Sequence, residues 1–358
     1  MNILLNTGHI LSDNKNVYTF CHQFINEIAV QNTDTRFYIT TNIEGLPSNV
    51  IFADINLNSW IAVKFGLNGF IKKNNIVLYV QLGDTPIPSN LSVPAVLMLH
   101  SQLGVNIPVT FERKARWSRL FANAGTIIVA TDIEKELLEE NFNRLEGKKV
   151  VVSGVAVDEI FRPIEDIDEL ERIKFQYSHE LSYIFCPVPK VDDREDMIQL
   201  LKAFSLLKNR HKNSIQLLLY SENFSEKFIE KLSSYKYRSD VLMIDNLEPA
   251  EYARILAASV FTVQLDDEGF STTVLESVRS GVSVFSGVNS NAYYFAGDNI
   301  VYYNKMEANE LFTLFNKFYV NEHLKNQYIA NAYIKSMDYS FEKLADNFKN
   351  DCLTGIVL

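Results

Sequence analysis

The sequence predicts an α/β protein with two consecutive units, each built on a parallel β-sheet. Short apolar runs alternate with amphipathic stretches along most of the chain, which is the pattern of repeated β-α-β units. The alternation breaks near residues 161–163 and then starts again. A length of 358 residues suits two domains of ordinary size.

The first unit is expected over residues 1–163. Its apolar runs predict strands, and the stretches with apolar residues at helical spacing predict helices between them. The expected strands are 3–5, 36–40, 76–80, 95–99, 126–130 and 149–152. The expected helices are 17–30, 111–124 and 133–141. Because helices separate the strands, we expect neighbouring strands to be parallel.

The second unit is expected over residues 164–335. It opens with five acidic residues among residues 164–171, which we interpret as a solvated linker. The expected strands are 183–188, 215–220, 241–244, 260–264 and 282–285. The expected helices are 195–208, 224–235, 249–258 and 272–280. We expect residues 336–358 to form a C-terminal helix that packs back toward the first domain.

Composition and charge exclude several classes of protein. Hydrophobic residues make up 47% of the chain and charged residues 22%, which rules out a disordered protein. The formal net charge is −10, so we expect no nucleic acid partner. Up to residue 163 the chain has 14 basic and 15 acidic side chains, and after it 20 and 29. A phosphate in the second unit would therefore need a local device, such as a helix N-terminus.

The cysteines and the N-terminus favour a reducing compartment. Cys21, Cys186 and Cys352 are far apart and form no metal-binding or disulfide pattern. The chain begins without the basic and apolar regions of a signal peptide, and it contains no apolar stretch long enough to span a membrane. We therefore expect a cytoplasmic protein.

Residues 263–276 carry the strongest functional pattern. Acidic residues crowd the loop after an apolar strand, and Gly269 lets the backbone approach a ligand closely. Ser271 or Thr272 can cap the next helix, whose free N–H groups suit a phosphate. Glu276 lies one turn further on, where it can accept hydrogen bonds from ribose hydroxyls. The alternative is that Glu276 and the loop acids are solvated surface residues.

The chain resembles a known family at this segment. Glu268-Gly269-Phe270 followed by Glu276 is similar to the E-x7-E pattern of retaining glycosyltransferases of family 4, the "group 1" enzymes with the GT-B fold. Other segments also resemble motifs of the family and occur in the family's order along the chain. They are residues 96–101, 153–158, 161–163, 256–261, 277–284 and 295–298. The resemblance implies two Rossmann-like parallel-sheet domains that face a central cleft.

The resemblance also implies roles for particular residues. Glu276 would bind the ribose of a nucleotide, and Glu268 would contact the donor sugar or help position the reacting centre. The backbone of Gly269, Phe270, Ser271 and Thr272 would hold the sugar and diphosphate. His100 would lie across the cleft near the donor sugar, although it could instead be a satisfied core histidine. The resemblance implies no metal and no cofactor beyond the nucleotide-sugar substrate.

The sequence departs from the family pattern where cations usually neutralise the diphosphate. Lys190 falls at the position of a usual Arg, which keeps the charge but loses the bidentate fork. Glu195 falls at the position of a usual Lys and reverses the charge, with Arg194 beside it. Either Arg194 substitutes for that cation, the alignment is offset by one, or the site is weakened. Residues 192–196 could also be solvated surface.

Two segments of the first unit are less specific. The loop after the first strand has one glycine, Gly8, which can give close approach to the donor or acceptor, but it is no dinucleotide-binding pattern. Residues 111–121 combine aromatic residues with four basic ones, which predicts a core-facing helix with a basic solvent face. The alternative is peripheral contact with the inner membrane surface.

We therefore predict a metal-independent retaining glycosyltransferase. It would transfer a sugar from a nucleotide-sugar donor to a hydroxyl of a glycan or lipid-linked glycan, as in polysaccharide biosynthesis. The alternative is a non-catalytic protein of the same fold that binds a nucleotide sugar, a glycan or a partner enzyme. A third reading is another GT-B enzyme, such as a sugar-nucleotide epimerase.

Overall fold

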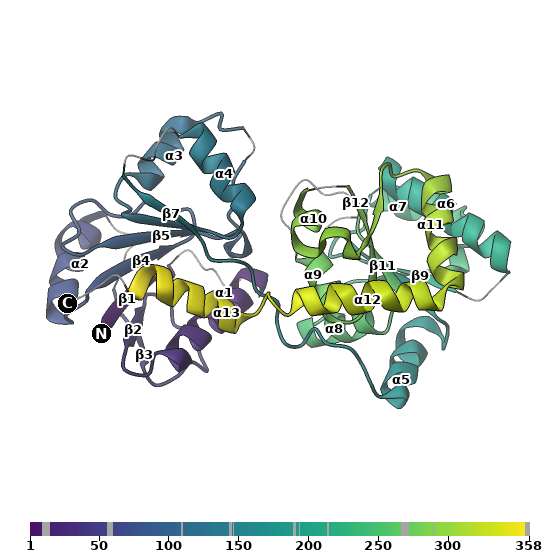
Figure 1. The fold of residues 1–358 in the computed structure, drawn as a ribbon, viewed down its shortest axis with the longest axis horizontal. Coiled ribbons are helices and arrows are strands. Elements are labelled where there is room, and N and C mark those ends of the chain that lie inside the picture. Colours follow the sequence, from purple (N-terminus) through teal and green to yellow (C-terminus); the bar gives the residue numbers. More distant parts are fainter. Residues whose placement is uncertain are drawn as a thin grey trace. The chain divides into compact units, whose positions relative to one another are not determined.

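The chain folds into two compact units (Figure 1), Met1–Ala156 with Tyr339–Leu358, and Val157–Asp338. The computed structural model describes residues 1–8, 15–55, 60–108, 110–142, 145, 147–188, 191–192, 194–212, 215–265, 272–288 and 290–354. The first boundary lies between residues 156 and 157, whereas the sequence predicted 163 and 164. Residues 157–163 pack within the second unit, as Phe161 does against Tyr252.

Within the described residues, the first unit contains a seven-stranded sheet in the order β3-β2-β1-β4-β5-β6-β7. All its strand pairs are parallel. Its strands are β1 (Asn2–Asn6), β2 (Arg36–Ile39), β3 (Val50–Phe52), β4 (Leu78–Leu82), β5 (Ala95–Leu99), β6 (Thr126–Val129) and β7 (Lys149–Val152). The sequence did not predict β3, because this edge strand has three residues and little burial.

Helices cover the first sheet. They are α1 (Lys15–Gln31), α2 (Trp60–Lys73), α3 (Lys114–Phe121), α4 (Asp132–Asn141) and, from the end of the chain, α13 (Phe341–Phe348), with the short helices η1 (Ser101–Leu103) and η5 (Lys349–Leu353). Phe24 of α1 meets Phe348 of α13 edge to face, with ring centroids 5.4 Å apart. The C-terminal helix therefore completes the core of the first unit (Figure 1).

Within the described residues, the second unit contains a six-stranded sheet in the order β10-β9-β8-β11-β12-β13. Its strand pairs are also parallel. The strands are β8 (Tyr183–Pro187), β9 (Gln216–Tyr220), β10 (Val241–Ile244), β11 (Phe261–Val263), β12 (Ser283–Gly287) and β13 (Val301–Tyr303). Separate apolar clusters on the two faces of this sheet show that both faces are covered.

The helices of the second unit include four that the sequence prediction missed, the first one and the last three along the chain. They are α5 (Ile167–Ser178), α6 (Glu195–His211), α7 (Glu226–Ser233), α8 (Pro249–Ala257), α9 (Thr273–Arg279), α10 (Ser290–Ala296), α11 (Ala308–Val320) and α12 (Glu322–Ser336), with η3 (Arg238–Asp240) and η4 (Gly297–Asn299). The prediction of a linker over residues 164–171 is wrong. The Asp166 side chain caps α5 by accepting the N–H of Asp168, and acids in the first turn suit the helix dipole.

No helix in the described parts of the chain is long and apolar enough to cross a membrane.

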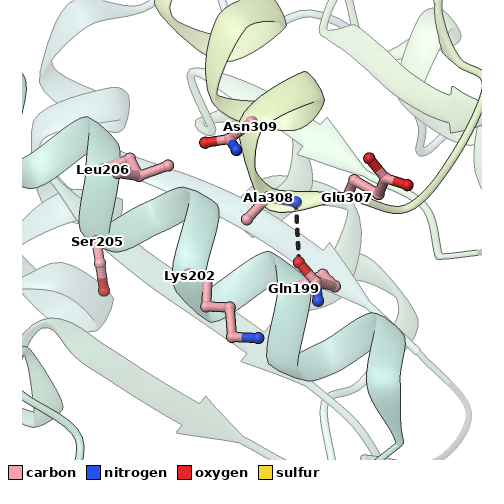
Figure 2. A pocket seen from close by; sticks show the side chains of 7 residues that line it. All are labelled: Gln199, Lys202, Ser205, Leu206, Glu307, Ala308 and Asn309. Atoms are coloured by element: carbon pink, nitrogen blue, oxygen red, sulfur yellow. Dashed lines mark hydrogen bonds between the residues drawn. The ribbon is translucent and has the colours of Figure 1, made fainter.

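A groove on the second unit lies where α11 begins beside α6 (Figure 2). Its lining residues are Gln199, Lys202, Ser205, Leu206, Glu307, Ala308 and Asn309. The Gln199 side chain accepts the backbone N–H of Ala308 at 3.0 Å, which satisfies one of the free N–H groups at the start of α11. None of the described residues predicted for the site lines this groove.

Gly281 occupies the turn between α9 and β12, in a backbone conformation that favours glycine. Its φ is +73°, and a Cβ built on it would lie 3.1 Å from Pro163 Cγ. We expect Gly281→Ala to destabilise the second unit by about 1–3 kcal/mol, because it adds both backbone strain and a clash. Calorimetric melting of the two units measures this effect.

Gly69 supplies the matched control. It lies inside α2, and a Cβ there would meet nothing within 4 Å. We expect Gly69→Ala to stabilise the first unit by about 0.5–1 kcal/mol, because alanine favours a helix interior. If both alanine variants changed the free energy of unfolding in the same direction, the role given to Gly281 would be wrong.

Candidate functional site

The candidate site of the second unit lies at the carboxyl end of β11. This strand ends at Val263, and α9 begins at Thr273. The predicted residues Glu268, Gly269, Phe270 and Ser271 of the connecting loop lie outside the described residues, as does Lys190. The described part of the site consists of Thr272, Glu276 and the side chains that contact them.

Two side chains hold the carboxylate of Glu276. The hydroxyl of Thr272 donates to Oε1, and the hydroxyl of Tyr252 on α8 donates to Oε2 at 3.4 Å. Burial raises the pKa of Glu276, the two hydrogen bonds oppose that rise, and the charge of Asp158 adds to it. The sequence predicted Thr272 and Glu276 but missed Tyr252, which lies more than twenty residues away and is brought close by the fold.

The sequence predicted that Ser271 or Thr272 caps α9; Ser271 lies outside the described residues, and the side chain of Thr272 does not cap the helix. Thr272 has helical dihedral angles, φ −81° and ψ −7°, and its side chain makes no capping bond. Its hydroxyl instead donates to Glu276, one turn along. Thr272 therefore orients the carboxylate rather than satisfying a backbone N–H at the start of the helix.

Among the described residues, carboxylates surround the cation at the start of α6. Arg194 directly precedes the helix, with its Nε 3.9 Å from Asp192 Oδ1 and 4.0 Å from Asp196 Oδ2. Glu195 is the first helical residue, and its carboxylate accepts from the side chain of Gln199. The charge of Arg194 is thus shared between two carboxylates, with a third beside it.

Gly8 follows β1 of the first unit at the edge of a buried polar network. Its N–H donates to Asn6 Oδ1 at 3.1 Å, and a Cβ on Gly8 would lie 3.2 Å from the same oxygen. Asn6 Nδ2 donates to Gln81 Oε1 at 2.7 Å and to Tyr79 Oη at 2.9 Å. The sequence prediction missed this network, although Asn6 and Gln81 are polar residues in otherwise apolar strands.

His100, at the end of β5, is a fully buried and fully bonded histidine. Its Nε2 lies 2.7 Å from the carbonyl oxygen of Gly154, and its Nδ1 accepts the N–H of Gln102 at 3.2 Å. Its ring stacks on Phe20 with centroids 4.8 Å apart. Burial lowers the pKa of His100 to about 4, so the ring is neutral. This geometry favours the core-histidine reading over contact with a donor sugar.

Within the described residues, no cluster of three or more His, Cys, Asp or Glu side chains could hold a metal ion.

Known proteins resemble this chain in the sequence of its second unit and in its fold. Residues 170–335 match the model of the family "Glycosyl transferases group 1". A glycosyltransferase from Rickettsia africae is similar in structure, with a TM-score of 0.72 and 12% identity, covering 98% of this chain and 97% of that one. Anabaena HepE in complex with UDP and glucose has a TM-score of 0.67 and 13% identity, covering 99% and 100%.

A third similar structure is WaaG, a glycosyltransferase involved in lipopolysaccharide biosynthesis. Its TM-score is 0.65 at 12% identity, covering 99% of this chain and 100% of that one. The fold is GT-B. No curated protein sequence matches the chain.

The buried neutral His100 predicts a pH-dependent contribution to stability. Because its pKa is lower in the folded chain than in the unfolded one, the unfolded chain takes up a proton first as the pH falls. The stabilising contribution of His100 is therefore lost between about pH 6.5 and about pH 4. We expect His100→Gln to lower the free energy of unfolding by about 1–3 kcal/mol at pH 7.5 and by less at pH 4.

Calorimetry of the first unit across this pH range measures the difference between the variant and the wild type. His211→Gln is the control, since His211 bonds to Asn316 in the second unit. A cost that does not change with pH would contradict the neutral state assigned to His100.

Proposed function

We propose that the chain is a nucleotide-sugar-dependent glycosyltransferase. The observation that carries the proposal is the oriented carboxylate of Glu276, at the carboxyl end of a strand in a parallel sheet. Ligands of open α/β sheets bind at these strand ends. The match of residues 170–335 to the group 1 family and the similarity to a structure holding UDP and glucose support the same reading.

The proposed reaction moves a sugar from a nucleoside diphosphate to an acceptor hydroxyl. The anomeric carbon exchanges its bond to the diphosphate oxygen for a bond to the acceptor oxygen, whose proton passes to the departing diphosphate. The electron pair of the broken bond stays on the diphosphate. Glu276 would accept hydrogen bonds from the ribose. Arg194 would face the diphosphate, as the sequence predicted, and Lys190 lies outside the described residues.

The finer features remain part of the proposal. We propose retention of configuration, an acceptor that is a glycan or lipid-linked glycan, a reaction without a metal, and a cytoplasmic location. Contact with the inner membrane surface would use α3, where Arg113, Lys114, Arg116 and Arg119 are exposed around a half-buried Trp117. A basic face of this kind suits anionic lipid headgroups.

Glu276→Gln tests the proposed donor site. The amide keeps the size of the side chain but loses the charge, so its hydrogen bonds to ribose hydroxyls weaken. We expect the affinity for a nucleoside diphosphate to fall about tenfold to a hundredfold. Thermal stabilisation by UDP, GDP, ADP and dTDP measures it, because ligand at about 100 times its dissociation constant adds roughly 2.7 kcal/mol.

Glu230→Gln on α7 is the matched control, since it makes the same charge change at an exposed position. If no nucleoside diphosphate stabilises the wild type, the proposed function is wrong. If one does and Glu276→Gln binds it equally well, the site assignment is wrong.

A second function is favoured by the carboxylates around Arg194. Asp192, Glu195 and Asp196 oppose the binding of a diphosphate, which fits a non-catalytic protein that binds a nucleotide sugar, a glycan or a partner enzyme. Glu195→Lys separates the two functions. For a weakened site, we expect the diphosphate affinity to rise about tenfold, measured by titration calorimetry.

A loss of glycosyl transfer in Glu195→Lys would instead show that Glu195 has a role of its own in a working enzyme. Gln199, the neighbour that donates to Glu195, is not a suitable control position. Its side chain also accepts the backbone N–H of Ala308, so Gln199→Glu would disturb the start of α11 as well. Glu226→Lys, at the first helical position of α7, makes the same charge change at the start of another helix.

A further inference from the structure

Tyr252 is held rigidly in the second unit by three aromatic neighbours. Its ring centroid lies 5.2 Å from that of Tyr220, 5.7 Å from Phe185 and 6.0 Å from Phe161. These rings come from β9, β8 and the segment 157–163, so they surround Tyr252 from different parts of the chain. Such packing leaves the ring little rotational freedom and fixes where its hydroxyl points.

The hydroxyl of Tyr252 points at the carboxylate of Glu276. It donates to Oε2 at 3.4 Å, and the phenol oxygen also has a side-chain hydrogen bond with Thr273. Burial and the neighbouring carboxylate of Glu276 raise the pKa of Tyr252 well above its usual value. The phenol therefore stays protonated and remains a donor at every physiological pH.

Two donors on different oxygens fix the plane of a carboxylate, whereas one donor leaves it free to turn about its last bond. Thr272 binds Oε1 and Tyr252 binds Oε2. An ionised carboxylate offers about four acceptor positions, so with respect to the described residues each oxygen keeps one for a ligand. Two acceptors in a fixed plane suit a pair of adjacent hydroxyls, such as the 2′ and 3′ hydroxyls of a ribose.

We propose that Tyr252 is a positioning residue that orients Glu276 to bind a vicinal diol, and so selects a ribonucleotide over its 2′-deoxy form. This inference rests on the proposed function, since it takes Glu276 to be the ribose-binding residue. It adds a residue outside the E-x7-E pattern and a selectivity that follows from it. The 3.4 Å bond is long, so its loss should cost little stability.

The test compares UDP with dUDP, GDP with dGDP and ADP with dADP by titration calorimetry. We expect the wild type to prefer one ribonucleotide to its 2′-deoxy form by about tenfold. Tyr252→Phe keeps the ring in its aromatic surroundings and removes only the hydroxyl. We expect it to weaken ribonucleotide binding by about threefold to tenfold and to abolish most of the preference over the deoxy form.

Tyr183→Phe is the matched control. Its hydroxyl donates to the carbonyl oxygen of Ile255 at 2.6 Å, so the variant also loses a buried hydrogen bond to α8 but none to Glu276. We expect Tyr183→Phe to melt at a lower temperature and to keep the ribose preference. In the Glu276→Gln background, Tyr252→Phe should have no further effect on binding, because the hydroxyl acts through Glu276.

The outcomes separate the inference from the function on which it rests. A wild type that binds none of these nucleotides overturns the proposed function. A wild type that binds a ribonucleotide, with a Tyr252→Phe variant that keeps the full preference over the deoxy form, overturns the role of Tyr252 alone. Equal effects of Tyr252→Phe in the wild type and in Glu276→Gln would also overturn it, because the two side chains would then act independently.

Discussion

Burial of both faces of two parallel sheets is the constraint on which the rest of this structure depends. Every residue of the central strands β4, β5 and β12 is buried. Helices must therefore follow the strands, and polar groups have room chiefly where strands end. Asn6 and Gln81 in the first unit and the Thr272–Glu276 pair in the second lie at such ends. The location of the candidate site is thus a consequence of the architecture.

In the candidate site, hydrogen bonds compensate in part for the burial of a charged group. A carboxylate loses solvation when it is buried, and the hydroxyls of Thr272 and Tyr252 replace part of the lost water. Within the described residues, each of the two carboxylate oxygens accepts one such hydrogen bond. At the start of α6 the balance is different, because carboxylates share the one described cation, Arg194. Within the described residues, Glu276 is thus held by two donors, whereas Arg194 lies beside carboxylates.

The sequence predicted most strands because apolar runs are local signals. It missed β3 and β13, which have three residues each, and α2, whose Gly66 and Gly69 weaken the helical pattern. It interpreted the acidic residues at the start of α5 as a linker, because the residue types that cap a helix are also common in solvated loops. Tyr252 and the partners of His100 could not be predicted, because such contacts join residues far apart in the sequence.

The short helix α9 links the candidate site to both chain segments that lead out of the second unit. Gly281, just after α9, packs on Pro163, and the ring of Phe161 packs on Tyr252. At the other segment, Arg279 donates to the carbonyl oxygen of Ser336 at 3.3 Å, directly before the chain returns to the first unit. The residues that orient Glu276 and those that anchor these two segments thus form one packed group. A substitution in either segment is therefore expected to change the orientation of Glu276 through contacts within the second unit.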